Sequence, residues 1–209
     1  MTTKPQLILI GAGGHARSCI DVIEEQGYFQ IAGLVGFPEQ RDSQQLDYGY
    51  AVIGADSDLS SLANIYEHAL ITIGQTQSAG HRIRLYQEIT QLGFQLPVII
   101  ASTAYVSPHA TIGAGTIVMH GAIVNAGAQI GNNCIINSRA LIEHDARVED
   151  HCHISTGAIL NGDVTVGSGS FIGSGSVTKH GITIGNGCVV GMGTSVRHNL
   201  SDQLCFTGD

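Results

Sequence analysis

Tryptophan is absent from this chain of 209 residues, and only 12% of its residues are charged. Nine Lys and Arg residues stand against 17 Asp and Glu residues, which gives a formal net charge of −8. Proteins that bind nucleic acid or an anionic membrane surface carry basic patches, so this balance disfavours both partners. The apolar runs are too short for a membrane-spanning helix. The opening residues also lack the apolar core of a secretory signal, so we expect a cytoplasmic protein.

What the chain does have is a strict repeat in its second half. From Val106 to Val196 an aliphatic residue occupies every sixth position, with Thr178 as the exception. A small or β-branched residue follows four positions after each of these, and Gly, Asn and Asp crowd the positions between. A period of six fits neither an α-helix nor one long strand, but it fits short strands joined by tight corners. Three such strands make a coil of 18 residues, so residues 101–209 are predicted to form a β-helix.

Coils of this kind stack at the spacing of hydrogen-bonded strands, about 4.8 Å, so about five coils give a rod of about 24 Å. The large aliphatic residue fills the interior, and the small residue also points inward. Cys134, Cys152 and Cys188 occupy the small inward position. The odd total of five cysteines argues against a disulfide framework, and we expect these three to be core thiols and not metal ligands.

The first hundred residues follow a different pattern. A short apolar strand, Gln6–Ile10, runs into a glycine turn and then a helical stretch, which is typical of a parallel α/β sheet. The same alternation continues, so residues 1–100 are predicted to be a small Rossmann-like domain. The further expected elements are strands at Ile31–Val35, Tyr50–Ile53, Ala69–Ile73 and Gln95–Ile100 and a helix at His81–Leu92.

Ligands of parallel α/β sheets bind beyond the carboxyl ends of the strands. The loops at Gly11–His15, at Val35–Phe37 and at Gly74 should therefore converge. Backbone N–H groups at the glycine turn would then approach a phosphate. A dinucleotide needs an acidic residue directly after the second strand, and the nearest here is Glu39, so NAD is disfavoured. The alternative is that the glycines only make tight turns. The candidate substrate-binding residues are Gly13, Gly14, His15, Val35, Gly36 and Gly74.

Three segments together resemble one family. The turn Gly11–Arg17, the segment Gly93–Pro97 before the repeat and the tetrad Ile142–Asp145 are similar to the sialic acid O-acetyltransferase NeuD family of hexapeptide acyltransferases, most of all its PglD-type UDP-N-acetylbacillosamine N-acetyltransferase members. The resemblance covers nearly the whole chain. It implies a left-handed parallel β-helix, a homotrimer with active sites between subunits, acetyl-CoA in the groove and a nucleotide-linked amino sugar on the first domain.

His144 is the candidate general base, because its hexad position points out of the prism. The neighbouring carboxylates, Glu143 and Asp145, are both candidates to orient the imidazole. The resemblance selects Asp145. It also implies that His153, Ser174 and Met192 contact acetyl-CoA. A zinc site shared between subunits, using His144 with His151 or His153, is disfavoured by the spacing, and no metal is expected.

The expected reaction is acetyl transfer from acetyl-CoA to the amine of a nucleotide-linked amino-dideoxy sugar, of the UDP-4-amino-4,6-dideoxy-N-acetylglucosamine type, for a bacterial surface glycan. Two alternatives are O-acetylation of sialic acid and a non-catalytic β-helix that binds a sugar nucleotide. The chain departs from the family at Val35 and Gly36, where relatives carry acidic residues, so the nucleotide base stays open. Relatives also continue past the position of Asp209, so the natural chain either stops early or is shortened.

Overall fold

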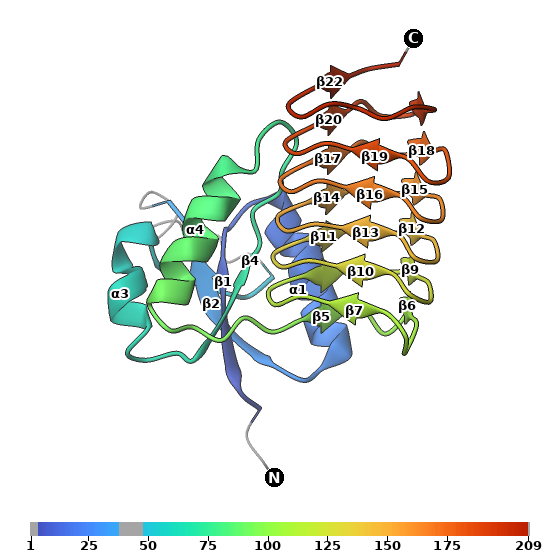
Figure 1. Ribbon diagram of the computed structural model, residues 1–209. Helices are drawn as coiled ribbons and strands as arrows, with labels where there is room; N and C mark the ends of the chain where they lie inside the picture. The colour runs from blue at the N-terminus through green and yellow to red at the C-terminus, as the bar shows by residue number, and fades with distance from the viewer. Residues whose placement is uncertain (1–3, 38–47, 209) are drawn as a thin grey trace. The chain divides into compact units, whose positions relative to one another are not determined.

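The computed structural model describes residues 4–37 and 48–208 (Figure 1). Two compact units divide the chain: Met1–Gly74 with Arg84–Pro97 form the first, and Gln75–Ile83 with Val98–Asp209 form the second. The segment 75–83, which we expected in the N-terminal domain, therefore packs within the second unit. None of the helices in the described ranges is long and apolar enough to cross a membrane.

The first unit contains a four-stranded parallel sheet in the order β3-β2-β1-β4. Its centre is β1, whose residues Leu7 to Ile10 are fully buried because both faces of a parallel sheet are covered. The small Rossmann-like domain with a parallel sheet that the sequence predicts is confirmed. The elements are β1 (Gln6–Ile10), α1 (Gly14–Gln26), β2 (Gln30–Val35), β3 (Val52–Gly54), η1 (Asp56–Asp58), α3 (Leu59–Leu62), β4 (His68–Ile71) and α4 (Gly80–Gln91), which begins in the segment 75–83.

The predicted strand Gln95–Ile100 is wrong. Gln95 makes a single isolated bridge to His68. Pro97 follows and has no N–H to donate to a ladder, so the strand stops there. The next strand, β5 (Ile99–Ile100), pairs with β8 of the repeat. Because Ile100 is in phase with the aliphatic positions, the repeat begins one hexad earlier than the sequence analysis placed it.

The second unit is a left-handed parallel β-helix made of three ladders of two-residue strands. Neighbouring strands of a ladder are 18 residues apart, as in the pair Ile142↔Leu160. The last pair, Val189↔Cys205, is 16 residues apart. The ladders are β5, β8 (Ile117–Val118), β11 (Ile135–Ile136), β14 (His153–Ile154), β17 (Phe171–Ile172), β20 (Val189–Val190) and β22 (Cys205–Phe206); β7 (Thr111–Ile112), β10 (Gln129–Ile130), β13 (Arg147–Val148), β16 (Thr165–Val166) and β19 (Thr183–Ile184); and β6 (Tyr105–Val106), β9 (Ile123–Val124), β12 (Leu141–Ile142), β15 (Ile159–Leu160), β18 (Val177–Thr178) and β21 (Ser195–Val196).

The interior of the β-helix is the continuous core that the hexads predict. The aliphatic residues from Val118 to Val196 are at most 4% exposed. Thr178 is also buried, and its hydroxyl is satisfied because it accepts a hydrogen bond from the Asn161 backbone N–H at 3.0 Å. The thiols of Cys134, Cys152 and Cys188 are free and fully buried. These three cysteines are core residues, as expected.

Candidate functional site

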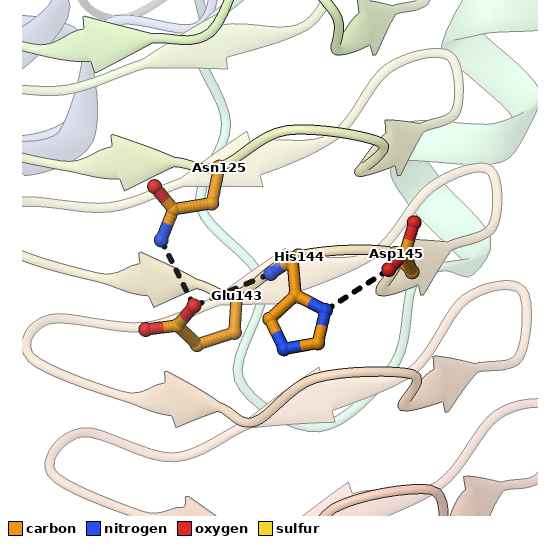
Figure 2. A network of polar contacts seen from close by, with 4 residues as sticks. All are labelled: Asn125, Glu143, His144 and Asp145. Atoms are coloured by element: carbon orange, nitrogen blue, oxygen red, sulfur yellow. Dashed lines mark hydrogen bonds and ion pairs between the residues drawn. The ribbon is translucent and has the colours of Figure 1, made fainter.

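His144 lies at the corner that follows β12, and its side chain is 58% exposed. Its Nδ1 atom lies 2.9 Å from Asp145 Oδ2 (Figure 2). Asp145 adopts a left-handed backbone conformation with φ of 61°. Strand alternation alone would have sent the two side chains to opposite faces, but the corner turns the carboxylate back toward the imidazole. The His144–Asp145 contact therefore depends on the backbone turn at the corner and not on the alternation of side chains along a strand.

Glu143 is also close to His144 but does not contact its ring. Its Oε2 atom accepts hydrogen bonds from Asn125 Nδ2 at 3.0 Å and from the His144 backbone N–H at 3.3 Å. Figure 2 shows Glu143 and Asp145 on opposite sides of the His144 ring, with Asn125 beside Glu143. Glu143 thus fixes the backbone that carries the histidine, and Asp145 is the carboxylate at the imidazole.

The pairing sets the chemistry of the imidazole. A carboxylate accepts hydrogen bonds, so the Nδ1 of His144 carries the proton and its Nε2 is left with a free lone pair when the ring is neutral. The hydrogen bond to Asp145 is the main cause that raises the pKa of His144, and the negative charges of Asp145, Glu143 and Asp163 add to it. An exposed Nε2 of raised basicity is suited to take a proton from a substrate.

Two glycines make room for this pair. Gly162 lies one coil beyond His144, and a Cβ atom there would come within 2.7 Å of both Cε1 and Nε2 of the imidazole. Gly127 lies one coil before Asp145, and a Cβ atom there would collide with its carboxylate. The His180 ring packs on the other side of Gly162, with its centroid 6.2 Å from that of His144. We did not predict Gly162 or Asn125, although the 18-residue register places both beside the pair.

Replacing the carboxylate tests the cause of the raised basicity. We expect Asp145→Asn to lower the pKa of His144, because the largest raising contribution is lost while the fold is kept. An NMR titration of the His144 ring measures this directly, with Asp202→Asn as the control at another exposed carboxylate. An unchanged His144 midpoint in Asp145→Asn would show that the contact does not govern its protonation.

His153 is placed very differently from His144. It is 6% exposed, its Nδ1 donates to the Gln75 carbonyl oxygen at 2.7 Å, and its Nε2 lies 3.1 Å from Asn137 Nδ2. Burial lowers its pKa to about 4. The ring is thus a neutral imidazole with both nitrogens occupied within its own chain. Its expected contact with acetyl-CoA stays a prediction, and it would have to use the ring carbons or neighbouring groups.

Ser174 and Met192 lie at a different corner of the prism, after β17 and β20. They occupy the same hexad position one coil apart, and Met192 is 83% exposed. The Ser174 hydroxyl is 2.9 Å from that of Ser155. A single chain therefore does not bring these two residues to His144, because whole faces of the prism separate the corners.

In the first unit, the three predicted loops converge beyond the carboxyl ends of the strands. Gly11 N–H donates to the Val35 carbonyl at 2.8 Å, and the Thr72 hydroxyl donates to the Gly11 carbonyl at 2.9 Å. A Cβ atom on Gly74 would lie 3.6 Å from that of His15. Gly11 has a φ of +124°, and a Cβ atom there would lie 3.1 Å from the backbone of Thr72 and Ile73, which follow β4. This position therefore requires glycine.

The exposed rim of these loops is formed by Gly13, Gly14 and Gly74. Nothing lies within 4 Å of a Cβ position at Gly13 or Gly14, so the turn before α1 presents open backbone. Val35, by contrast, is 1% exposed and belongs to the core, so its side chain cannot reach a ligand. Gly36 donates its N–H to the Gly54 carbonyl at 2.9 Å. Glu39 lies outside the described residues.

Within residues 4–37 and 48–208 there is no cluster of three or more His, Cys, Asp or Glu side chains that could hold a metal ion. His144 and His153 in particular belong to separate networks. The exposed imidazole on the β-helix and the glycine-rimmed strand ends of the first unit are therefore the candidate sites that the proposal below uses.

The sequence matches three known families. Residues 6–89 match the PglD N-terminal domain. Residues 109–144 and 127–162 match the bacterial transferase hexapeptide repeats, and residues 163–197 match the hexapeptide repeat of succinyl-transferase. A comparison with curated proteins gives no match.

Several solved structures are similar over nearly the whole chain. PerB from Caulobacter crescentus, in complex with CoA and GDP-perosamine, is 32% identical with a TM-score of 0.86, and the match covers 94% of this chain and 91% of that one. The acetyltransferase domain of PglB from Neisseria gonorrhoeae FA1090, in complex with acetyl coenzyme A, is 31% identical with a TM-score of 0.85, covering 96% and 95%. WeeI from Acinetobacter baumannii AYE, at 20% identity and a TM-score of 0.79 over 94% of each chain, shares the fold.

Proposed function

The chain belongs to the NeuD/PglD-type family of hexapeptide-repeat acyltransferases, and from this premise we propose that it is an N-acetyltransferase acting on a nucleotide-linked amino sugar, with acetyl-CoA as the donor. The observation that carries the proposal is the exposed His144–Asp145 pair on a β-helix joined to a Rossmann-like unit. O-acetylation of free sialic acid would leave the phosphate-accommodating glycine turn of the first unit without a use.

The reaction needs a base and no covalent enzyme intermediate. The sugar amine attacks the thioester carbonyl, its proton passes to Nε2 of His144, and the C–N bond forms as the C–S bond breaks. The thiolate of coenzyme A leaves and takes up the proton. Asp145 holds Nδ1–H and stabilises the imidazolium that forms in between, as the acid of a catalytic triad does.

The first unit supplies the sugar-nucleotide site. We assign the diphosphate to the N-terminus of α1, where the N-cap Gly13 leaves the helix without a side-chain cap and Gly14 and His15 follow. The buried Val35 and the half-buried Gly36 provide no carboxylate for the base or ribose. The GDP-perosamine complex of a 32% identical protein supports a guanine nucleotide as an alternative to the expected uridine nucleotide.

We propose a homotrimer with acetyl-CoA between neighbouring β-helices. One outer face carries a column of apolar side chains, in which Tyr105 is 55%, Ile123 is 39% and Val177 is 37% exposed. Such a patch is normally covered by a partner. Packing this face against a second copy would allow His144 of one chain to meet the Ser174 and Met192 corner of the next. Five free thiols fit a reducing, cytoplasmic setting.

The test is an acceptor comparison with the purified protein. Acetyl-CoA is mixed with UDP- and GDP-linked 4-amino-4,6-dideoxy sugars and, separately, with free sialic acid, and thiol release is followed. We expect release with at least one of the nucleotide-linked amines and none above background with sialic acid. Release only with sialic acid would favour O-acetylation, and no release with any of them would contradict an acetyltransferase.

Gly162 should be essential for the placement of the base. Gly162→Ala puts a methyl group 2.7 Å from the His144 ring, so the ring must move. Because a displacement of about 1 Å can cost about 100-fold in rate, we expect a fall in kcat of that order. The control is the same substitution combined with His144→Ala. There the alanine at 162 should have little further effect, whereas an equal loss in both backgrounds would indicate a general folding defect.

A further inference from the structure

The corner of the β-helix that carries His144 changes the sign of its charge along the rod. Near the histidine the side chains are acidic: Glu143, Asp145 and, one coil on, Asp163. The next two coils carry Lys179 and Arg197 at the position that Glu143 occupies in its own coil. In the two coils before His144, the same corner is formed by residues 107–109 and 125–127. These described residues include no Lys or Arg.

Lys179 and Arg197 occupy equivalent positions in two consecutive coils. Thr178 pairs with Val196, and the Lys179 N–H donates to the Val196 carbonyl at 2.7 Å, so the two cations follow neighbouring strands in register. Both are exposed. Arg197 Nε has the neutral Ser195 hydroxyl at 3.5 Å, and across the described part of the chain neither cation has a carboxylate partner. Like charges in adjacent strands repel, so this arrangement is unfavourable unless an anion joins it.

Two imidazoles extend the same column. His180 follows Lys179 and packs beside the ring of His144, and His198 follows Arg197 with its ring 5.9 Å from that of Phe206. Along this corner of the β-helix, the side chains therefore run from the imidazole of His144 to the positive charges of Lys179 and Arg197. In a chain with only nine Lys and Arg residues and a net charge of −8, two cations at equivalent positions of consecutive coils are a local feature and not a consequence of composition.

The spacing matches the donor. Arg197 is three coils beyond the level of Glu143 and His144, which is about 14 Å at the usual strand spacing. The pantetheine arm between the thioester sulfur and the first phosphorus has the number of backbone bonds of roughly four amino-acid residues, about 15 Å when extended. With the thioester at His144, an arm that runs toward the C-terminal coils would place its phosphates beside Lys179 and Arg197.

We propose that Lys179 and Arg197 bind the 5′-diphosphate of coenzyme A and so fix the direction in which acetyl-CoA lies along the β-helix. This assignment rests on the proposed function. Guanidinium and ammonium groups form strong charge-assisted hydrogen bonds with phosphate oxygens. Because the site is exposed, its contribution should weaken as salt screens it.

The test uses the full-length double variant Lys179→Gln/Arg197→Gln, which removes both charges and keeps long polar side chains. We expect the KM for acetyl-CoA to rise about tenfold while kcat changes less than about twofold, since the reacting groups are untouched. With S-acetylpantetheine, which has no phosphate, the double variant and the wild type should have the same kcat/KM. The matched control is Arg147→Gln, an exposed cation on another face, which should leave the KM unchanged.

Acetyl-dephospho-CoA keeps the diphosphate and lacks the 3′-phosphate, so the double variant should lose as much with it as with acetyl-CoA. An unchanged KM for acetyl-CoA would overturn the proposal, as would an equal rise in Arg147→Gln. Loss of the effect with acetyl-dephospho-CoA would also overturn it, because the 3′-phosphate would then be the bound group. These outcomes concern only the variants. The proposed function is tested by the acetyl transfer of the wild type, which none of them affects.

Discussion

His144→Ala should lose about 10²- to 10⁴-fold in kcat for acetyl transfer, which is the usual contribution of a positioned general base. The change removes the exposed imidazole whose Nδ1 lies 2.9 Å from the Asp145 carboxylate. The KM for acetyl-CoA should change little, because the ring contributes to proton transfer and not to holding the phosphates. Steady-state kinetics with both substrates varied measures the two parameters separately.

The matched control is His180→Ala, which removes a neighbouring exposed imidazole in the same column. It should keep most of the activity, because no carboxylate of residues 4–37 or 48–208 is seen to contact that ring. The pH dependence gives an independent check. A neutral His144 is required, so the wild-type kcat/KM should fall as the pH drops through its raised pKa, and in Asp145→Asn this fall should move to lower pH. A wild-type rate in His144→Ala would show that His144 is not the general base.

Leu160→Ala should lower the free energy of unfolding by about 2–5 kcal/mol. Leu160 is fully buried in the β-helix, where its strand pairs with that of Ile142, two residues before His144. Removing its side chain leaves a cavity in a column whose coils support one another, and neighbouring coils cannot collapse into it without breaking register. The midpoint of urea unfolding, followed by circular dichroism, reports the change.

Thr165→Ala serves as the control, because Thr165 occupies the outward position of the next strand in the same coil and lies only partly buried. We expect it to cost less than about 0.5 kcal/mol, as most surface changes do. Equal losses in the two variants would mean that the outer face, and not the interior column, limits the stability of the β-helix.

The fold could be read from the sequence to the extent that periodicity encodes it. A strict period of six specifies which residues point inward, and the structure buries even Thr178, the polar exception to the pattern. The strand at Gln95–Ile100 failed because short apolar runs do not reveal their partners. Only Pro97 and the phase of Ile100 show that the segment ends one sheet and begins another.

The site was less accessible to sequence reasoning. The choice between Glu143 and Asp145 depends on the left-handed conformation of Asp145, which strand alternation does not predict. The resemblance assigns His153 to acetyl-CoA, yet in the structure Gln75 and Asn137 contact both nitrogens of its buried ring. Gln75 lies 78 residues away in the chain. Contacts of that separation carry no periodic signal, so only the folded structure reveals them.

The most direct test of the account is to determine which bond the protein makes. The wild-type protein is incubated with acetyl-CoA and a nucleotide-linked 4-amino-4,6-dideoxy sugar, and the product is analysed by mass spectrometry and NMR. We predict one added acetyl group held as an amide on the sugar nitrogen, with the nucleotide still attached. An acetyl ester on a hydroxyl group, or acetylation of the free sugar alone, would contradict it.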